Sequence, residues 1–356
     1  MSEVAGLWIS FGFASLMIMG AGVLLVKSAD RISDITGLGK AWAGVLLLAT
    51  ATSIPEVVVG IGAIITADSP DLAAGGAFGS NVVNLLFLAV LGLIPAWRGL
   101  LTERSDEARS LGLYGIALSA TAGALVLLSR WDLAGESNLI AVLPLLLPIL
   151  YLVFLYRTFG GEMSLARIDP RRLILFRPQP IELPIAQEEV GARPSLIPSV
   201  IVYGVATAIV VVAGLWLSDT GGRLSDELGW SESFMGSLFL ALSTSLPELA
   251  VAIAALRIGS IELALANLLG SNMFNMGIVL GADAAVFGTG NFYEEMGVIH
   301  ALTAAFSIAM TALVIYRPAP NVEFGRPVAF NWQASATAAG VIGLFVATSL
   351  ATFAWG

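Results

Sequence analysis

A five-residue pattern that could bind a cation occurs twice in the sequence. Residues 52–56 read Thr-Ser-Ile-Pro-Glu and residues 244–248 read Thr-Ser-Leu-Pro-Glu, and each copy lies inside a long apolar run. A carboxylate in the hydrocarbon of a bilayer costs at least about 2.5 kcal/mol, so a membrane segment retains one only where it has a partner. Calcium takes a shell of oxygen ligands that includes carboxylates. The pattern therefore predicts that Glu56 and Glu248, with the neighbouring hydroxyls, form a cation site.

The prolines of the two copies could supply further ligands. A proline inside a helix removes a backbone donor and clashes with the preceding turn. We therefore expect Pro55 and Pro247 to kink their helices and to free carbonyl oxygens near Thr52 and Thr244.

A second repeated pattern places polar residues on two further apolar segments. Residues 79–84 read Gly-Ser-Asn-Val-Val-Asn and residues 270–275 read Gly-Ser-Asn-Met-Phe-Asn. In each copy the serine and the second asparagine are four residues apart and share one helical face. Such residues suit either a cation site or hydrogen bonds between membrane helices.

Other polar and small residues receive simpler interpretations. Asn81 and Asn272 either touch the ion or brace the packing, and both alternatives stay open. The Gly-x-x-x-Gly spacing at residues 75–79 predicts close helix contact only. Asp283 lies near the end of an apolar stretch, where an interfacial position is expected. His300 is the sole histidine, so we expect a hydrogen-bonded or interfacial side chain and exclude a zinc site.

The composition is that of a helical membrane protein. Of the 356 residues, 57% are hydrophobic and only 12% are charged, which leaves too little polar surface for a soluble protein of this length. A net charge of -9 with only two lysines argues against nucleic acid as a partner. The chain has no cysteine, which excludes disulfides and thiolate metal sites. We expect an all-α polytopic membrane protein whose ligand chemistry uses hard oxygen atoms.

Ten apolar stretches approach the roughly 20 residues that span a bilayer. They are residues 6–26, 41–65, 72–94, 111–128, 139–156, 199–217, 234–256, 263–287, 296–316 and 332–353. The predicted units are residues 1–156 with helices one to five, a polar linker loop at 157–198, and residues 199–356 with helices six to ten. The first stretch has no preceding basic region, so we expect a retained span and no signal peptide.

Basic residues orient the predicted spans. With the N-terminus outside, all of them except Arg130 and Arg223 fall on the cytoplasmic side. This places both termini outside and the 157–198 loop in the cytoplasm. We expect an integral protein of the plasma, or inner, membrane, with the bilayer and transported ions as its partners and no obligate protein partner.

The two halves of the chain are related by an internal repeat. Residues 21–56 align without a gap on residues 213–248, and the identities include Gly22 with Gly214 and Pro55 with Pro247. Because five spans, an odd number, separate equivalent positions, the halves enter the membrane from opposite sides. Such inverted repeats bind their substrates between the halves near the midplane. The predicted fold is ten transmembrane helices in two inverted five-helix repeats.

At these motifs the chain resembles the calcium/cation antiporter superfamily, particularly its ten-span prokaryotic sodium/calcium exchangers. Those proteins carry Gly-Thr-Ser-Leu-Pro-Glu and Gly-Asn-x-x-Gly-Ser-Asn motifs, and the resemblance covers essentially every span. It implies a compact core of spans two to five and seven to ten, across which spans one and six slide. The implied ion-binding residues, of which the alanines would contribute backbone carbonyls only, are Ala49, Thr52, Ser53, Glu56, Ser80, Asn84, Ala241, Thr244, Ser245, Glu248, Ser271 and Asn275.

The chain departs from the pattern of this family at several positions. Ala51 and Ser243 stand where the family usually has glycine, Gly76 replaces the usual asparagine, and Ala266 replaces a glycine. Asn275 is the sharper departure, because several members carry an aspartate there. The site then holds two carboxylates, which balance one divalent ion, so the transport ratio of the family is not carried over.

The leading hypothesis is a secondary active antiporter, without enzymatic activity or cofactor, that exchanges calcium for sodium by alternating access. The alternative keeps the fold but couples calcium, or another divalent cation, to protons, since an intramembrane carboxylate can take up a proton. An intramembrane hydrolase would use Ser53 or Ser245 as its nucleophile, but His300 is the only histidine available as a base. A passive channel accounts less well for the inverted repeat.

Overall fold

The computed structural model describes residues 2–36, 42–101, 106–130, 145–166, 196–257, 259–287, 292–316 and 332–356. Within these ranges every regular element is helical, as the all-α prediction requires. The first half contains α1 (Ser2–Thr36), α2 (Trp42–Ala67), α3 (Pro70–Leu93), the 3-10 helix η1 (Pro95–Leu101), α4 (Asp106–Leu128) and α6 (Leu146–Ala166). The second half contains α7 (Leu196–Leu228), α8 (Glu232–Phe234), the π-helix η4 (Met235–Leu240), α9 (Ala241–Thr244), α10 (Leu246–Arg257), α11 (Ile261–Phe274), the π-helix η5 (Asn275–Val279), α12 (Leu280–Phe287), α13 (Phe292–Glu295), α14 (Ile299–Tyr316) and α15 (Trp332–Trp355).

These helices confirm a polytopic membrane fold. Seven helices of the described ranges are long and apolar enough to cross a bilayer, and the bent pair Glu232–Thr244 and Leu246–Arg257 makes eight. Two shorter apolar helices, Ala51–Ala67 and Leu146–Thr158, lie at the second and fifth predicted spans. The count of ten spans therefore stays a prediction. α6 continues to Ala166, into the predicted linker loop, and residues 167–195 of that loop lie outside the described residues.

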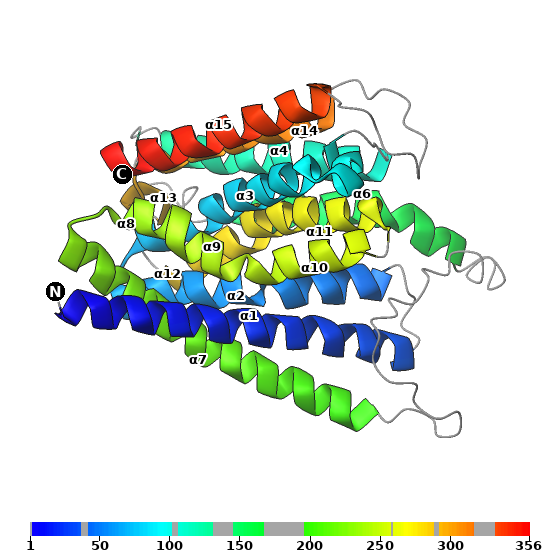
Figure 1. The fold of residues 1–356 in the computed structure, drawn as a ribbon, viewed down its shortest axis with the longest axis horizontal. Coiled ribbons are helices and arrows are strands. Elements are labelled where there is room, and N and C mark those ends of the chain that lie inside the picture. Colours follow the sequence, from blue (N-terminus) through cyan, green and yellow to red (C-terminus); the bar gives the residue numbers. More distant parts are fainter. Residues whose placement is uncertain are drawn as a thin grey trace.

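The helices are arranged as layers of a bundle (Figure 1). α1 and α7 pack against each other along one side and run in opposite directions, while α14 and α15 lie together on the opposite side. Between them lie α2, α3, α10 and α11, which carry the polar motifs. Because α1 and α7 begin the two halves, their antiparallel course is the one that an inverted repeat requires.

Both chain ends lie at the same end of the bundle (Figure 1). The carboxylate of Glu3 lies 3.9 Å from the guanidinium of Arg223, near the end of α7. The hydroxyl of Ser231 donates to the carbonyl of Thr352, near the end of α15, at 3.0 Å. The structure thus agrees with the prediction that both termini share one side, and the side of the membrane that they occupy stays a prediction.

A buried histidine–aspartate pair ties α14 to α3. His300 is fully buried, and its Nε2 lies 2.9 Å from Oδ1 of Asp71 in the first turn of α3. Oδ1 of Asp71 also accepts a hydrogen bond from the N–H of Gly297. The prediction of a hydrogen-bonded histidine is confirmed. Arg130 donates to the carbonyl of Met296, beside α13, so this arginine also lies at the end that holds the termini.

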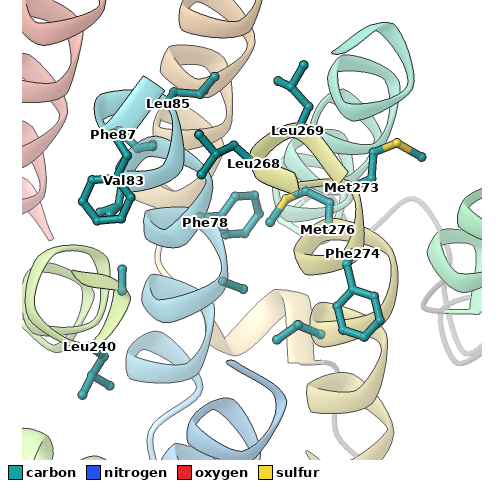
Figure 2. Packing of buried hydrophobic residues seen from close by; sticks show 14 of the residues in the cluster. Phe78, Val83, Leu85, Phe87, Leu240, Leu268, Leu269, Met273, Phe274 and Met276 are labelled. Carbon is teal, nitrogen blue, oxygen red and sulfur yellow. The ribbon is translucent and has the colours of Figure 1, made fainter. Parts of the chain in front are cut away.

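Apolar packing fixes α3 against the second half of the chain. Figure 2 shows Phe78 of α3 pointing toward Leu268 and Met276, and all three side chains are buried. On another face, Gly75 and Gly79 let α3 approach the backbone of η4: a Cβ on Gly75 would lie 3.0 Å from the Cα of Gly236, and one on Gly79 would overlap the backbone of Ser237. The predicted role of the Gly-x-x-x-Gly spacing in helix contact is therefore confirmed.

We expect Gly79→Ala to destabilise the protein by about 1–3 kcal/mol, because the added methyl group meets backbone atoms that cannot move aside like a flexible side chain. Gly76→Ala is the matched control, since a Cβ there has no atom within 4 Å. It should be neutral or slightly stabilising, because alanine favours the helix over glycine. Thermal unfolding in detergent measures both variants, and equal midpoints would contradict this contact between α3 and η4.

Candidate cation-binding site

Each of the two glutamates receives its hydroxyl neighbours from the opposite half of the chain. Oγ of Ser245 donates to Oε1 of Glu56 at 3.4 Å. Reciprocally, Oγ of Ser53 donates to Oε1 of Glu248 at 3.5 Å. The two motifs that repeat in the sequence therefore meet face to face, and each carboxylate lies against the serine of the other motif.

Hydroxyls from α3, α11 and the two threonines surround the carboxylates further. Ser271 donates to Oε1 of Glu248 at 3.3 Å, and Thr52 lies beside the same carboxylate. Oγ of Ser80 lies 3.4 Å from Oγ1 of Thr244. All of these side chains are buried, so the cluster is polar but shielded from solvent.

Four asparagines link α3 to the α11–η5 segment. Nδ2 of Asn84 donates to Oδ1 of Asn272 at 3.0 Å, and Nδ2 of Asn272 donates to the carbonyl of Asn81 at 3.2 Å. Nδ2 of Asn275 donates to Oδ1 of Asn81 at 3.2 Å. These bonds favour the bracing interpretation of Asn81 and Asn272, because their side-chain groups bond other asparagines, and ion contact at these two residues stays untested.

The second proline motif is a broken helix. α9 ends at Thr244, Ser245 leaves the helical conformation with φ -83° and ψ 2°, and α10 continues after a bend of 43°. The kink predicted at Pro247 is thus confirmed. In the first half, α2 continues through Pro55 without a break. The helix is therefore broken at the second copy of the motif and continuous at the first.

Four buried oxygen atoms of the repeated motifs have no hydrogen-bond partner in the part of the chain that the structure describes. They are Oε2 of Glu56, Oε2 of Glu248, Oδ1 of Asn84 and Oδ1 of Asn275, on side chains that are at most 4% exposed. Leaving a buried acceptor unpaired costs about 1–3 kcal/mol, and such atoms are rare in folded proteins. A cation bound among them would take the place of the missing donors.

The charge and donor types restrict which cation the cluster suits. Glu56 and Glu248 lie close enough for their charges to repel each other. Among the described residues, no group of three or more His, Cys, Asp or Glu side chains is placed to hold a metal. A cation here would therefore be held by two carboxylates together with hydroxyl and amide oxygens, a hard donor set that suits calcium and not zinc.

The structure brings five of the predicted site residues into contact with the two glutamates: Thr52, Ser53, Thr244, Ser245 and Ser271. Ser80 contacts Thr244, whereas Asn84 and Asn275 bond other asparagines. That these residues bind a cation stays a prediction. Ala49 lies in the part of α2, residues 42–50, whose side chains and surroundings fall outside the described residues. Ala241 is fully buried beside the cluster, and its carbonyl accepts hydrogen bonds from the N–H of Ser245 at 3.0 Å and from the hydroxyl of Thr244 at 3.3 Å. In this conformation the carbonyl of Ala241 already has two donors.

The long helices α1 and α7 cover the two motifs at equivalent glycines. A Cβ on Gly22 of α1 would overlap the ring of Pro247, and a Cβ on Gly214 of α7 would lie 2.7 Å from Cγ1 of Val58. Each long helix therefore rests beside a glutamate of the opposite half. Gly22 and Gly214, which make these contacts, are aligned positions of the internal repeat.

Ser243 adds a polar contact between α1 and the motif helix. It stands where the resemblance leads us to expect glycine, and its hydroxyl accepts a hydrogen bond from Ser15 of α1 at 2.9 Å. This departure from the family pattern thus affects the contact with α1 and leaves the carboxylates unchanged.

Two features of this region differ from, or are absent from, the sequence-based predictions. Asp283 is fully buried in the protein, where α12 packs this carboxylate against Gly60 of α2, a contact that was not predicted; its depth in the bilayer stays a prediction. The π-helices were not predicted, although η5 begins at Asn275 and η4 immediately precedes α9. A π-helix often marks a functional site in a helical protein, but its extra residue per turn leaves no signature in the local sequence.

Comparisons with known proteins agree with this architecture. The model of the family described as sodium/calcium exchanger protein matches residues 6–160 and 198–351. Inner membrane protein YrbG of Escherichia coli (strain K12) is 33% identical over 285 residues, which cover 76% of this chain and 79% of YrbG. A crystal structure of the H+/Ca2+ exchanger CAX has a TM-score of 0.66 at 14% identity, covering 98% of this chain and 85% of that one. A structure of the sodium-calcium exchanger NCX_Mj has a TM-score of 0.54 at 19% identity, covering 95% of this chain and 97% of that one. At these identities the two structures show likeness of fold.

Proposed function

This chain belongs to the sodium/calcium exchanger family, and we propose that it is a secondary active antiporter that exchanges calcium for sodium by alternating access. The membership also confirms the resemblance to the calcium/cation antiporters, which are transporters. The proposed ion-binding residues are those of the cluster around Glu56 and Glu248. Access to this cluster would alternate as α1 and α7 move across the remaining helices.

One observation carries the proposal: the carboxylates of Glu56 and Glu248 are buried between the halves of the chain, each against the motif of the other half. One oxygen of each carboxylate, and the amide oxygens of Asn84 and Asn275, have no hydrogen-bond partner among the described residues. A hydrogen-bonded structural cluster would have donors for these atoms. Two carboxylates neutralise one calcium ion, and sodium ions would compete for the same oxygens. The two access states would bind the ions with different affinities, and this difference would couple the two fluxes.

Proton coupling is the alternative, in which one or both glutamates take up protons when calcium leaves. The fold does not separate the two modes, because it matches both an H+/Ca2+ exchanger and a sodium-calcium exchanger. Both modes use the same buried glutamates. The choice between them rests on the coupling experiment.

Calcium uptake into proteoliposomes tests the coupling ion directly. We expect an imposed sodium gradient to drive uptake at constant pH, and a pH gradient without sodium to drive none. Uptake driven only by the pH gradient would instead establish the proton-coupled alternative. In a plasma membrane with the termini outside, an inward sodium gradient would favour calcium export.

Asn275→Asp should tighten calcium binding by at least about tenfold. The added carboxylate attracts the ion with about 8 kcal/mol for a divalent charge at 4 Å and an effective dielectric constant of 20, well above the roughly 1.4 kcal/mol that a tenfold change requires. Calorimetry on the purified protein measures the affinity. Asn84→Asp, at the equivalent position of the repeat, should act in the same direction, and an unchanged or weaker affinity in both variants would remove these amides from the site.

A further inference from the structure

Asp283 is a buried carboxylate that the cation cluster does not use. It lies on α12, is 0% exposed, and neither of its oxygens has a hydrogen-bond partner among the described residues. A Cβ on Gly60 of α2 would lie 2.5 Å from Oδ1 and 2.7 Å from Oδ2. The carboxyl group therefore rests on the bare backbone of α2, and any larger residue at position 60 would displace it.

A second buried polar group near Asp283 is the phenol of Tyr293 on α13. Tyr293 is 2% exposed, and within the described part of the chain its hydroxyl has no hydrogen-bond partner. Burial raises the pKa of the Tyr293 phenol, and Asp283 would raise it further when ionised, so the two groups are close enough to interact electrostatically. A carboxyl and a phenol thus share an apolar part of the bundle.

The other ionisable groups on the elements packed against α12 do not neutralise Asp283. α12 packs on α2, α3, α6, α13 and η5. Among the described side chains, α2 carries Glu56, α3 carries Asp71, which is paired with a histidine, and η5 carries no ionisable group. α6 contributes the buried Tyr151, packed over η5, and the exposed Tyr156 and Arg157. α13 contributes Tyr293 with two exposed glutamates. None of these is a cation beside the carboxylate.

We propose that Asp283 is a proton-binding site, separate from the paired glutamates, whose carboxyl is a neutral acid while α12 packs against α2. An ionised carboxylate without donor or cation in a dry site is strongly disfavoured, and such a group takes a proton instead. A metal ion needs several oxygen ligands, whereas the unpaired side-chain oxygens that the described residues place here are the two of Asp283 and the phenol oxygen of Tyr293. A proton needs a single oxygen.

Asp283 contacts α2 one helical turn from Glu56, so its proton lies near the cation cluster. Gly60 follows Glu56 by four residues, so both lie on one face of α2, one helical turn apart. The offset that aligns residues 79–84 with 270–275 places Gly92 at the equivalent position of the first half, so the acid occurs in the second half alone. Water that reaches Asp283 would remove the proton and place a negative charge one turn from Glu56. The inference does not depend on the transport proposal, because proton binding is measured without ion flux.

Infrared spectroscopy of the full-length protein with isotope-labelled aspartate tests the proposal. At neutral pH we expect one aspartic acid carbonyl band per chain, which disappears at alkaline pH. The band should be absent in Asp283→Asn, which preserves the size of the side chain, and unchanged in Asp71→Asn, the matched control. Absence of a protonated aspartate band from the wild-type protein at neutral pH would overturn the proposal even if Asp283→Asn did not fold. Persistence of the band in a folded Asp283→Asn variant would overturn it as well.

Discussion

Glu56→Gln and Glu248→Gln are each expected to lower calcium flux to the level of protein-free liposomes. The amide removes one of two charges that balance a divalent ion and can place an N–H donor where a cation needs an acceptor. Loss of one unit charge about 4 Å from a divalent ion forfeits several kcal/mol even at an effective dielectric constant of 20. That corresponds to more than about a thousandfold in affinity. Radioactive calcium uptake under a sodium gradient measures the loss.

The matched control for the glutamate variants is Glu262→Gln. Glu262 lies in the first turn of α11 and is exposed, so its replacement should leave flux unchanged. Both site variants should still fold, since glutamine can accept the hydrogen bonds from Ser245 or Ser53. Wild-type flux in either variant would remove that glutamate from the proposed site.

Gly22→Leu is expected to slow exchange by about 5- to 150-fold while calcium still binds. The leucine would overlap Pro247 in the present arrangement of α1 and α10, and overpacking of this kind costs about 1–3 kcal/mol. A free-energy cost that applies in only one access state shifts the population toward the other state by about 5- to 150-fold. Flux should therefore decrease although the oxygen ligands are intact.

Gly20→Leu is the control for the α1 contact, because Gly20 lies on the same helix and a Cβ there has no atom within 4 Å. Its flux should match the wild type. Calcium titration followed by tryptophan fluorescence shows whether each variant still binds the ion. Normal turnover in Gly22→Leu would mean that α1 need not press on Pro247 during transport, and loss of binding would mean that the substitution damages the site itself.

The sequence predicts this site well because its chemistry is unusual for its surroundings. Glu56 and Glu248 interrupt apolar runs where a carboxylate is costly, and each occurs beside the same hydroxyl and proline residues. The repeat then places them in corresponding positions of two halves with opposite orientation. Residue type, spacing and repetition thus lead to the same pair of carboxylates, and the described part of the structure brings them together.

Features that depend on three-dimensional context were not predictable in the same way. Pro55 and Pro247 have equivalent local sequences, yet only the second helix breaks, so the local sequence does not determine the break. Asp283 lies near the end of an apolar stretch, which suggests an interfacial position. Its burial results from the contact of α12 with Gly60, more than two hundred residues away in the sequence.

The crossed arrangement of serines and glutamates has a consequence for how this protein can evolve. Oε1 of Glu56 receives its hydrogen bond from Ser245, and Oε1 of Glu248 receives one from Ser53. Although a duplicated gene segment normally frees one copy to diverge, here a substitution in one copy alters the hydrogen bonding of the carboxylate in the other. Substitutions in the two halves should therefore occur together during evolution. A second substitution that restores a damaged motif should most often arise in the half that was not mutated.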